Sequence, residues 1–180
     1  MKVYSFCPLC AHGLLRTVVG ARERLYCPVC SWVHYLNPLP ATIAYTLNNN
    51  NELLVVKRAH EPAINEWSLP GGFLEAGEDP HEGCLRELME ETSLKGEIDC
   101  LIGIYNLEVK HYGSVLVVAY KVRVSDDMIA INHELHDGGF FSLHRMPEIR
   151  IPLHIQIMRD GESKNFSHKS YCCPGLVCNR

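Results

Sequence analysis

The segment from residue 71 to residue 94, GGFLEAGEDPHEGCLRELMEETSL, constrains this chain most, because acidic side chains crowd into it. If its RELMEE part is helical, Glu87, Glu90 and Glu91 lie at positions i, i+3 and i+4 and share one face. Like charges at that spacing repel one another, and a cation that bridges them would relieve the repulsion. Clustered hard oxygens suit Mg²⁺ or Mn²⁺ better than Zn²⁺. The segment therefore predicts a divalent-cation site on one helix.

The start and the buried side of this helix can also be predicted. Asp79 is expected to be the N-cap, Pro80 the first helical residue, and Glu82 the N3 acid of a capping box. Just before the helix, Pro70-Gly71-Gly72 predicts a turn where the backbone approaches other groups closely, so that the Gly72 carbonyl can serve as an oxygen ligand. The apolar residues of the helix fall on the side away from the glutamates and are expected to face a core: Cys84, Leu85, Leu88 and Met89.

This segment resembles the Nudix box, in which Gly is followed by five residues, Glu, seven residues and then R-E-U-x-E-E-x-G-U, where U is aliphatic. Here five residues separate Gly72 from Glu78, and seven more precede Arg86, which opens RELMEETSL. Ser93 departs from the pattern, which has Gly at this position. Since the position ends the helix, we expect Ser93 to strain or reshape the following loop and to leave the ligands in place. The alternative is an exposed acidic helix with solvated i, i+4 pairs, which would not need Gly, Glu and Arg at these offsets.

The resemblance implies an α/β fold, the Nudix α/β/α sandwich with a mixed sheet, and a pyrophosphohydrolase. By the resemblance, Glu90 and Glu91 are ligands of the catalytic Mg²⁺ or Mn²⁺, and Glu87 is a ligand or the general base. Arg86 is expected to pair with Glu78 or another box carboxylate and to fix the loop against the helix. A further acid after the box adds a ligand or a base in some relatives, and Glu134 is the candidate for it here, against the alternative of a solvated loop acid.

Four cysteines near the start of the chain form a second motif, Cys7-Pro-Leu-Cys10 and Cys27-Pro-Val-Cys30, with sixteen residues between the two pairs. This spacing predicts a structural Zn²⁺ held by four thiolates in a zinc ribbon. The alternatives are two disulfides, which need an oxidising compartment, or a redox motif, which would follow a strand of a βαβ unit. Residues 22–26 are expected to lead into the second pair as a strand. We expect the ribbon not to fold without its metal.

The ribbon, the Tyr35-x-Asn37-Pro38 step and the box together resemble the zinc-ribbon subgroup of Nudix hydrolases, which includes ADP-ribose and FAD pyrophosphatases. The chain is expected to divide into a ribbon at residues 1–36, a Nudix domain at 37–160 and a poorly ordered tail at 161–180. NADH pyrophosphatases carry an S-Q-P-W-P-F-P array after the box, and its absence here disfavours NADH as the substrate. The tail contains Cys172, Cys173 and Cys178, for which the sequence suggests no function.

The rest of the Nudix domain is expected to be mostly strands. The runs 41–47 and 53–57 predict a hairpin, because the asparagines between them tolerate left-handed backbone. The runs 98–109 and 114–124 predict two further strands. Residues 151–159 are expected to form a closing helix that presents Ile151, Ile155 and Met158 on one face.

Candidate substrate contacts lie outside the helix. Arg58 ends the second strand of the hairpin and is either a phosphate contact or a solvated strand end. Trp67 could stack on a base, although buried packing is the favoured interpretation. Tyr112 is a further candidate, with filling of a loop as the alternative. Gly71 and Gly72 complete the set because of the close approach that they allow.

The composition limits the partners. The 180 residues carry a formal net charge of −4, so that no general basic surface for nucleic acid is expected. No apolar run reaches transmembrane length and no signal peptide is recognised, which favours a cytoplasmic protein. We expect hydrolysis of a nucleoside diphosphate linked to another moiety, with ADP-ribose or FAD foremost, and a homodimer as in many relatives. A non-catalytic nucleotide sensor or partner-binding protein is the alternative from another class.

Overall fold

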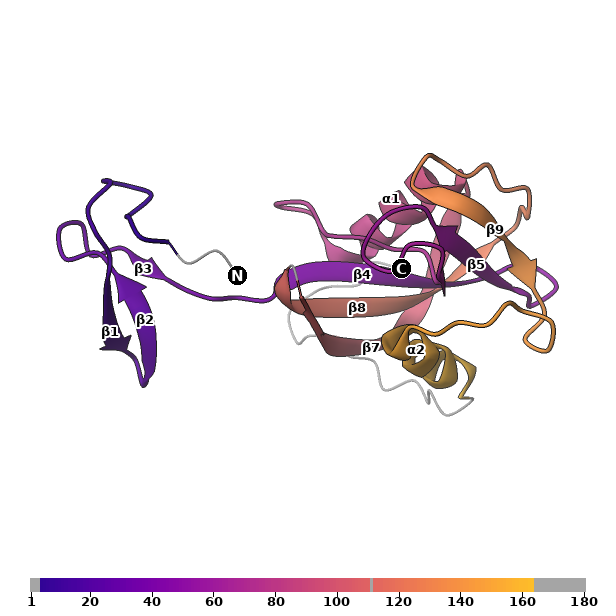
Figure 1. The fold of residues 1–180 in the computed structure, drawn as a ribbon. Coiled ribbons are helices and arrows are strands. Elements are labelled where there is room, and N and C mark those ends of the chain that lie inside the picture. The colour runs from indigo at the N-terminus through magenta and orange to yellow at the C-terminus, as the bar shows by residue number, and fades with distance from the viewer. Residues whose placement is uncertain (1–3, 111, 164–180) are drawn as a thin grey trace, which may run out of the picture. The chain divides into compact units, whose positions relative to one another are not determined.

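The computed structural model describes residues 4–110 and 112–163, and its fold is shown in Figure 1. The chain forms two compact units, which are described separately. One contains the residues up to Pro40 together with Asn106–Val117, and the other contains Ala41–Tyr105 together with the chain from Val118 onwards. The predicted boundary at residues 36 and 37 stays a prediction. The three tail cysteines lie outside the described residues.

The N-terminal unit holds a small antiparallel sheet in the order β1-β2-β3, formed by β1 (Leu15–Val19), β2 (Arg22–Tyr26) and β3 (Val33–His34). The expected strand at residues 22–26 is therefore confirmed. Each cysteine pair lies in a tight turn, and the two turns have the same backbone geometry. The N–H of Ala11 donates to the Cys7 carbonyl at 2.8 Å, and the N–H of Ser31 donates to the Cys27 carbonyl at 2.9 Å. Ala11 and Ser31 both have a positive φ, of 58° and 61°.

The second sheet has six strands, in the order β6-β5-β4-β8-β7, with β9 also paired to β5. Thr42 of β4 bonds to Val118 of β8 and Asn49 bonds to Ser125, which indicates that these two strands run in the same direction. Since the β5–β9 pair is antiparallel, the sheet is mixed, as expected. The strands are β4 (Leu39–Leu47), β5 (Leu53–Arg58), β6 (Trp67–Ser68), β7 (Gly96–Val109), β8 (Gly113–Val124) and β9 (Leu135–Phe141).

The predicted hairpin joins β4 to β5. The Asn48 side-chain oxygen accepts the N–H groups of Asn50 at 3.0 Å and of Glu52 at 2.9 Å, and Asn51 adopts a φ of 57°. Asparagine stabilises such turns because its short amide side chain can replace a backbone partner and because it tolerates left-handed backbone.

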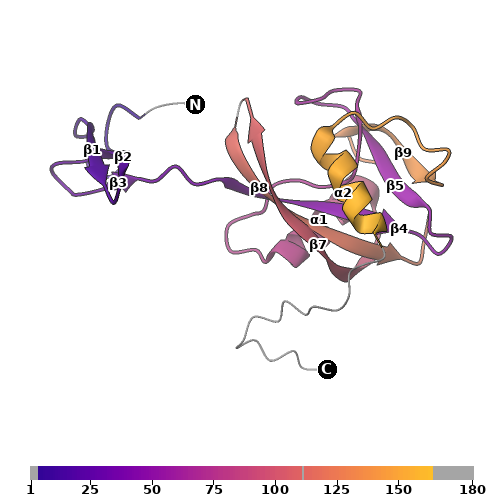
Figure 2. The ribbon, with the colours of Figure 1, turned by 90° about the horizontal axis from the view of Figure 1, so that it is seen from below.

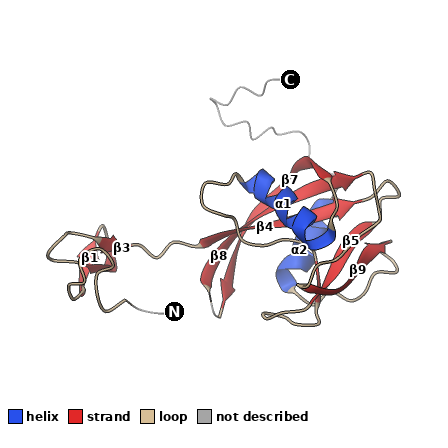
Figure 3. Cartoon of the chain, turned by 90° about the horizontal axis from the view of Figure 1, so that it is seen from above, coloured by secondary structure: helices blue, strands red, loops and turns tan. Residues whose placement is uncertain are grey.

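Two helices cover opposite faces of this sheet: α1 (Pro80–Thr92) and α2 (Pro152–Glu162). Ala44 of β4 packs in the core cluster with Cys84 and Leu88 of α1. The next residue, Tyr45, instead lies against Gly161 of α2. Successive residues of a strand point to opposite faces, so the sheet lies between the helices. Figures 2 and 3 view it from opposite sides, with α2 in front in one and α1 in front in the other. The α/β/α sandwich is therefore confirmed.

Two local expectations for the helices are wrong. Asp79 is the N-cap of α1 and Pro80 its first residue, but the capping box is not formed, because no side chain bonds at the cap. The residues of α2 that face the sheet are Leu153, Ile157 and Gly161, whereas Ile151, Ile155 and Met158 were expected there. Pro152 begins the helix, which leaves Ile151 outside it as the N-cap, and the buried i, i+4 series starts two residues after Ile151, at Leu153. No helix in the described part of the chain is long and apolar enough to cross a membrane.

Candidate functional site

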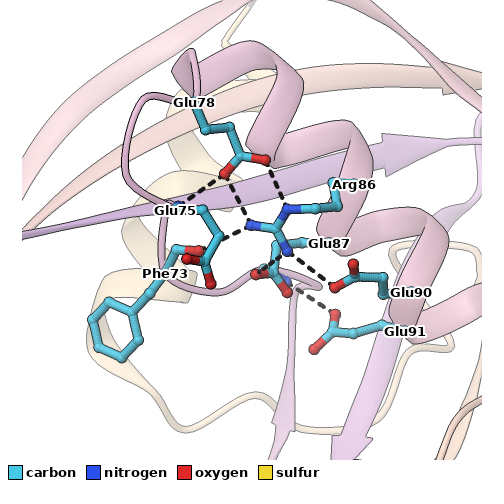
Figure 4. Close-up of polar contacts among 8 residues, drawn as sticks. Phe73, Glu75, Glu78, Arg86, Glu87, Glu90 and Glu91 are labelled. Carbon is cyan, nitrogen blue, oxygen red and sulfur yellow. Dashed lines mark hydrogen bonds and ion pairs between the residues drawn. The ribbon is translucent and has the colours of Figure 1, made fainter.

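Arg86 is the centre of a polar network that ties the loop before α1 to the helix (Figure 4). Its Nε and Nη2 donate to the two carboxylate oxygens of Glu78 at 2.7 and 3.0 Å, and Nη2 also donates to the Phe73 carbonyl at 3.1 Å. Its Nη1 donates to Glu87 at 2.9 Å and to Glu90 at 3.0 Å. The hydrogen bonds from Arg86 lower the pKa of Glu78 to about 2. The expected pairing of Arg86 with Glu78 is present, and only the planar fork of an arginine can make all these bonds at once.

Glu91 is a buried carboxylate at the back of the network. The residue is 5% exposed, and one oxygen of its carboxylate accepts the Gly71 N–H at 3.0 Å. Burial raises the pKa of Glu91 to about 8, and the charges of Glu87 and Glu134 act in the same direction, whereas Arg58 opposes them. A carboxyl group kept in such a place costs free energy unless a cation or a proton compensates its charge.

Glu87 lies beside the glycine turn and is nearly as enclosed. Its side chain is 14% exposed, against 56% for Glu90, and burial raises its pKa. A Cβ on Gly72 would meet the Glu87 carboxylate at 2.5–2.6 Å, and a Cβ on Gly71 would collide with the backbone of Thr42. Gly71 is therefore required by the close approach of backbone, as the sequence predicted, and a side chain on Gly72 would displace the Glu87 carboxylate. The Gly72 carbonyl accepts the Thr42 N–H at 2.8 Å, which leaves its second lone pair for another partner.

The three box carboxylates fit a hard divalent cation by their chemistry. Glu91 is buried and the Glu87 side chain is 14% exposed, and burial raises the pKa of both, so that their ionised forms need a compensating positive charge that the one N–H on Glu91 does not supply. Their oxygens are the ligands that Mg²⁺ and Mn²⁺ prefer. They do not converge on one point, however: among the described residues, the acids whose ligand atoms all lie within 4.8 Å are the exposed Asp79 and Glu82, with His81. Arg86 holds Glu87 and Glu90, and Gly71 holds Glu91, so that ligation requires these side chains to turn.

The backbone conformation at the C-terminal end of α1 explains why the box pattern has Gly at the position of Ser93. Ser93 is the C-cap, with a φ of 61° and a ψ of 15°, and its N–H donates to the Met89 carbonyl at 2.8 Å. This left-handed conformation is the one that favours glycine. The Ser93 hydroxyl donates to the Ala130 carbonyl at 3.2 Å. The serine therefore adopts the glycine geometry, which is strained for a residue with a side chain, and gains a bond. Of the two expected outcomes, strain is found and reshaping of the helix end is not.

The other predicted residues have contacts of their own. Glu134 is exposed, and its charge raises the pKa values of both Glu87 and Glu91, which places it near them. The Arg58 guanidinium donates from Nε to the Pro62 carbonyl at 2.9 Å, and its positive charge acts to lower the pKa of Glu91. Trp67 lies edge-on to Phe141 at 5.9 Å, as expected for packing. Tyr112, 46% exposed, follows β7 in the other compact unit, and its contact with substrate stays a prediction.

His154 of α2 was not predicted. Its Nδ1 accepts the Leu69 N–H at 2.9 Å, which fixes the chain just before the glycine turn. Burial, and then the charge of Arg58, lower the pKa of His154 to about 4, so that the ring is neutral and carries its proton on Nε2. A lone histidine among the apolar residues of IPLHIQIM gave no periodic or spacing signal.

The four ribbon cysteines form a compact cluster of sulfur atoms. The Sγ atoms of Cys7 and Cys30, of Cys10 and Cys27, and of Cys10 and Cys30 are each 3.5 Å apart. The four are not bridged by disulfides. The N–H of Cys30 bonds to the Cys27 sulfur and is the main cause that lowers the pKa of that thiol to about 6. Four thiol ligands in two matching turns fit a structural Zn²⁺.

Comparisons with known proteins agree with this geometry. The sequence model of the NUDIX domain matches residues 37–160, and that of the zinc ribbon described as "Nudix N-terminal" matches residues 5–36. The chain therefore belongs to the Nudix family and is a Nudix hydrolase.

Three relatives illustrate the likeness. The ADP-ribose pyrophosphatase of Methanocaldococcus jannaschii is 29% identical over 127 residues, which are 70% of this chain and 74% of that protein. A putative 8-oxo-dGTP diphosphatase of Bacillus subtilis is 39% identical over 59 residues, which cover 33% of this chain and 38% of that protein. The crystal structure of a NUDIX hydrolase from Nitrosomonas europaea superposes with a TM-score of 0.77 at 26% identity, covering 87% of this chain and 89% of that one.

Proposed function

We propose that the protein hydrolyses the diphosphate linkage of a nucleoside diphosphate joined to another moiety, with ADP-ribose as the first substrate and FAD as the second. The observation that carries this proposal is the pair of buried carboxylates, Glu87 and Glu91, against the Gly71-Gly72 turn. The likeness to the Methanocaldococcus jannaschii ADP-ribose pyrophosphatase, which spans most of both chains, supports the choice of substrate.

Glu87, Glu90, Glu91 and the Gly72 carbonyl would hold Mg²⁺ or Mn²⁺. When bound, the metal supplies positive charge to the diphosphate oxygens and makes a water molecule more acidic. Arg86 keeps the carboxylates of Glu87 and Glu90 within reach of each other and holds the Phe73–Glu78 loop in place. The absence of a side chain at Gly72 leaves the Glu87 carboxylate in place, since a Cβ there would collide with it.

The proton of the attacking water goes to a carboxylate. Glu134 is the proposed acceptor. Its charge raises the pKa values of Glu87 and Glu91, and it makes no ion pair among the residues that the structure describes. Glu87 is the alternative acceptor, although Arg86 already engages one of its oxygens. The water oxygen bonds to phosphorus as the bridging P–O bond breaks. The Arg58 charge beside Glu91 is placed to attract the phosphates.

The experiment is a turnover panel of ADP-ribose, FAD, NADH and nucleotide sugars with Mg²⁺ and with Mn²⁺, scored for release of AMP or another mononucleotide. We expect ADP-ribose to give AMP and ribose 5-phosphate faster than the other compounds. Binding of ADP-ribose without any turnover, with either metal, would instead establish a nucleotide-binding protein and refute the proposed activity.

The same proposal extends to location. Four free thiols in the ribbon are compatible with a reducing compartment, which supports the cytoplasm. Reduced thiols or zinc-bound cysteines in the protein isolated from its native cells would agree with this, and disulfides among the four would contradict it. A homodimer remains an expectation, which sedimentation of the purified protein tests.

A further inference from the structure

The chain between β8 and β9 returns to the end of α1. The last carbonyls of a helix lack partners within the helix. Here the Thr92 carbonyl accepts the Ala130 N–H at 2.9 Å, and the Glu91 carbonyl accepts the Asn132 N–H at 3.2 Å. The Ser93 hydroxyl closes the contact by donating to the Ala130 carbonyl. Residues 130–135, which we call the Glu134 loop, are thus fastened to the helix that carries the box carboxylates.

Asn132 makes three hydrogen bonds within this loop and to α1. Its N–H reaches the Glu91 carbonyl, its side-chain oxygen accepts the Glu134 N–H at 2.9 Å, and its carbonyl accepts the Leu135 N–H at 3.3 Å. The Glu134 carbonyl in turn accepts the Ala59 N–H at 2.8 Å, at the end of β5. Both backbone polar groups of Glu134 are therefore bonded, one of them through the side chain of Asn132.

We propose that Asn132 is a positioning residue, which sets the backbone of Glu134 relative to Glu91 so that the Glu134 carboxylate lies over the reacting phosphate. The inference rests on the proposed role of Glu134. One residue bonds both to the backbone of a predicted metal ligand and to that of the predicted base, so that the two are held at a fixed separation. Glu134 itself is exposed and without this bond would sample other backbone conformations. Holding a catalytic group in place ahead of reaction lowers the entropic part of the barrier.

Loss of the side-chain oxygen tests this inference. Asn132→Ala should reduce kcat by about 10-fold or more with KM changed less than about twofold, since a displaced base slows the chemical step and leaves binding intact. Asn132→Ser should restore most of kcat, because a serine hydroxyl can accept the same N–H two residues ahead. Faster hydrogen exchange at the Glu134 N–H in Asn132→Ala, and not in Asn132→Ser, is the readout that does not depend on activity.

Asn48→Ala is the matched control. Asn48 makes the same kind of side-chain bond, to Asn50 and Glu52, in the β4–β5 hairpin, and its loss should lower the melting temperature without changing kcat. Equal kcat in Asn132→Ala and wild type would overturn the inference, as would failure of serine to restore activity.

A double-mutant cycle shows whether Asn132 acts through Glu134. Once Glu134→Gln has removed the base, adding Asn132→Ala should cost little further activity. Effects that multiply would contradict the inference while leaving the proposed hydrolysis intact. If Glu134→Gln alone is fully active, the role of Glu134 fails and the inference fails with it. If no diphosphate is cleaved by the wild type, the proposed function itself is wrong, and that result is distinct from both.

Discussion

The two candidate metal sites of this protein are built in opposite ways. In the ribbon, four sulfur atoms already lie within 4.8 Å of one another, three of the pairs at 3.5 Å, in two turns of matching geometry. In the Nudix box, the carboxylates are engaged by other groups: one nitrogen of Arg86 bridges Glu87 and Glu90, and Glu91 is bonded to the Gly71 N–H. A closed set of four soft ligands suits a structural ion that never leaves, whereas hard ligands engaged by an arginine and a backbone N–H suit an ion that arrives with its substrate.

The two sites also differ in how much apolar packing supports the backbone around them. The ribbon has little apolar interior, and many of its large side chains are exposed, including Phe6, Leu9 and Val18. The box helix is packed through Cys84 and Leu88 into the main core. Metal is therefore expected to stabilise the fold in the ribbon and to serve chemistry in the box. The predictions below test that distinction, from the largest expected effect to the smallest.

Removing the ribbon ion should unfold the ribbon alone. Binding of a structural zinc contributes about 10 kcal/mol or more to small domains of this kind, and the free energy of folding is lost with it. Cys27→Ser, or a strong chelator, should make the amides of β1 and β2 exchange at the rate of an unfolded chain. The amides of β5 and α1 should keep their protection. Exchange that rises equally in both regions would show that the two are not independent.

Replacing the arginine of the network should impair the box and spare the ribbon. Arg86→Lys cannot bond to Glu78, Glu87, Glu90 and the Phe73 carbonyl together, because an ammonium lacks the planar fork. We expect kcat/KM to fall by about 100-fold and the Mg²⁺ concentration for half-maximal rate to rise. Arg150→Lys, which alters an exposed pair with Glu148, is the control and should behave as wild type. Unchanged kinetics in Arg86→Lys would mean that the network is not needed.

Burial of Glu91 should make the stability of the metal-free protein depend on pH. Its pKa is raised from 4.5 to about 8 on folding, so that the folded state binds the extra proton between these values. This carboxyl group therefore favours folding fully below pH 4.5, and that contribution is lost as the pH rises through 8. The loss amounts to a few kcal/mol at most, since one pKa unit corresponds to about 1.4 kcal/mol.

The Glu91→Gln variant isolates this effect from other titrating groups, such as His154. The difference in free energy of unfolding between Glu91→Gln and wild type, measured without divalent metal by urea titration, should grow in favour of the variant from pH 5 to pH 9. Saturating Mg²⁺ should reverse the order at pH 8. A difference that does not change with pH would mean that Glu91 is not buried as a charge.

The smallest effect is expected at Ser93. Ser93→Gly relieves the left-handed strain and loses the hydroxyl bond to Ala130, two changes of about 1 kcal/mol each in opposite directions. Ser93→Ala keeps the strain and loses the bond, so that it should be the less stable of the two variants by about 1 kcal/mol. Thermal unfolding of both proteins measures this, and an alanine variant as stable as the glycine variant would refute it.

Much of the fold could be predicted because its signals are local. The offsets from Gly72 to Leu94 predicted the acidic helix and its turn, the two C-x2-C pairs predicted the ribbon turns, and the asparagine run predicted the hairpin. Each depends on residues a few positions apart. The capping box failed at Asp79 because the pattern permits a side-chain bond without requiring it.

The rest depends on contacts between distant parts of the chain. The Asn132 N–H bonds to the Glu91 carbonyl, and the His154 side chain bonds to the Leu69 N–H across 85 positions, so that at least one partner in each pair is a backbone group that every sequence possesses. No pattern of side chains in the sequence predicts such a bond. The buried face of α2 was misjudged for a related reason, because apolar residues on several sides of the helix allow more than one face and only the sheet selects Leu153 and Ile157.

The most direct test of the distinction between the two sites compares Glu90→Gln with Glu82→Gln, in protein that carries one zinc ion per chain. Both residues lie on α1, and Glu82 has no bond to Arg86. With ADP-ribose and saturating Mg²⁺, we expect Glu90→Gln to lose activity by about 100-fold or more and Glu82→Gln to match wild type, with equal zinc content and melting temperature in all three. Wild-type turnover by Glu90→Gln would contradict the assignment of the box as the catalytic metal site.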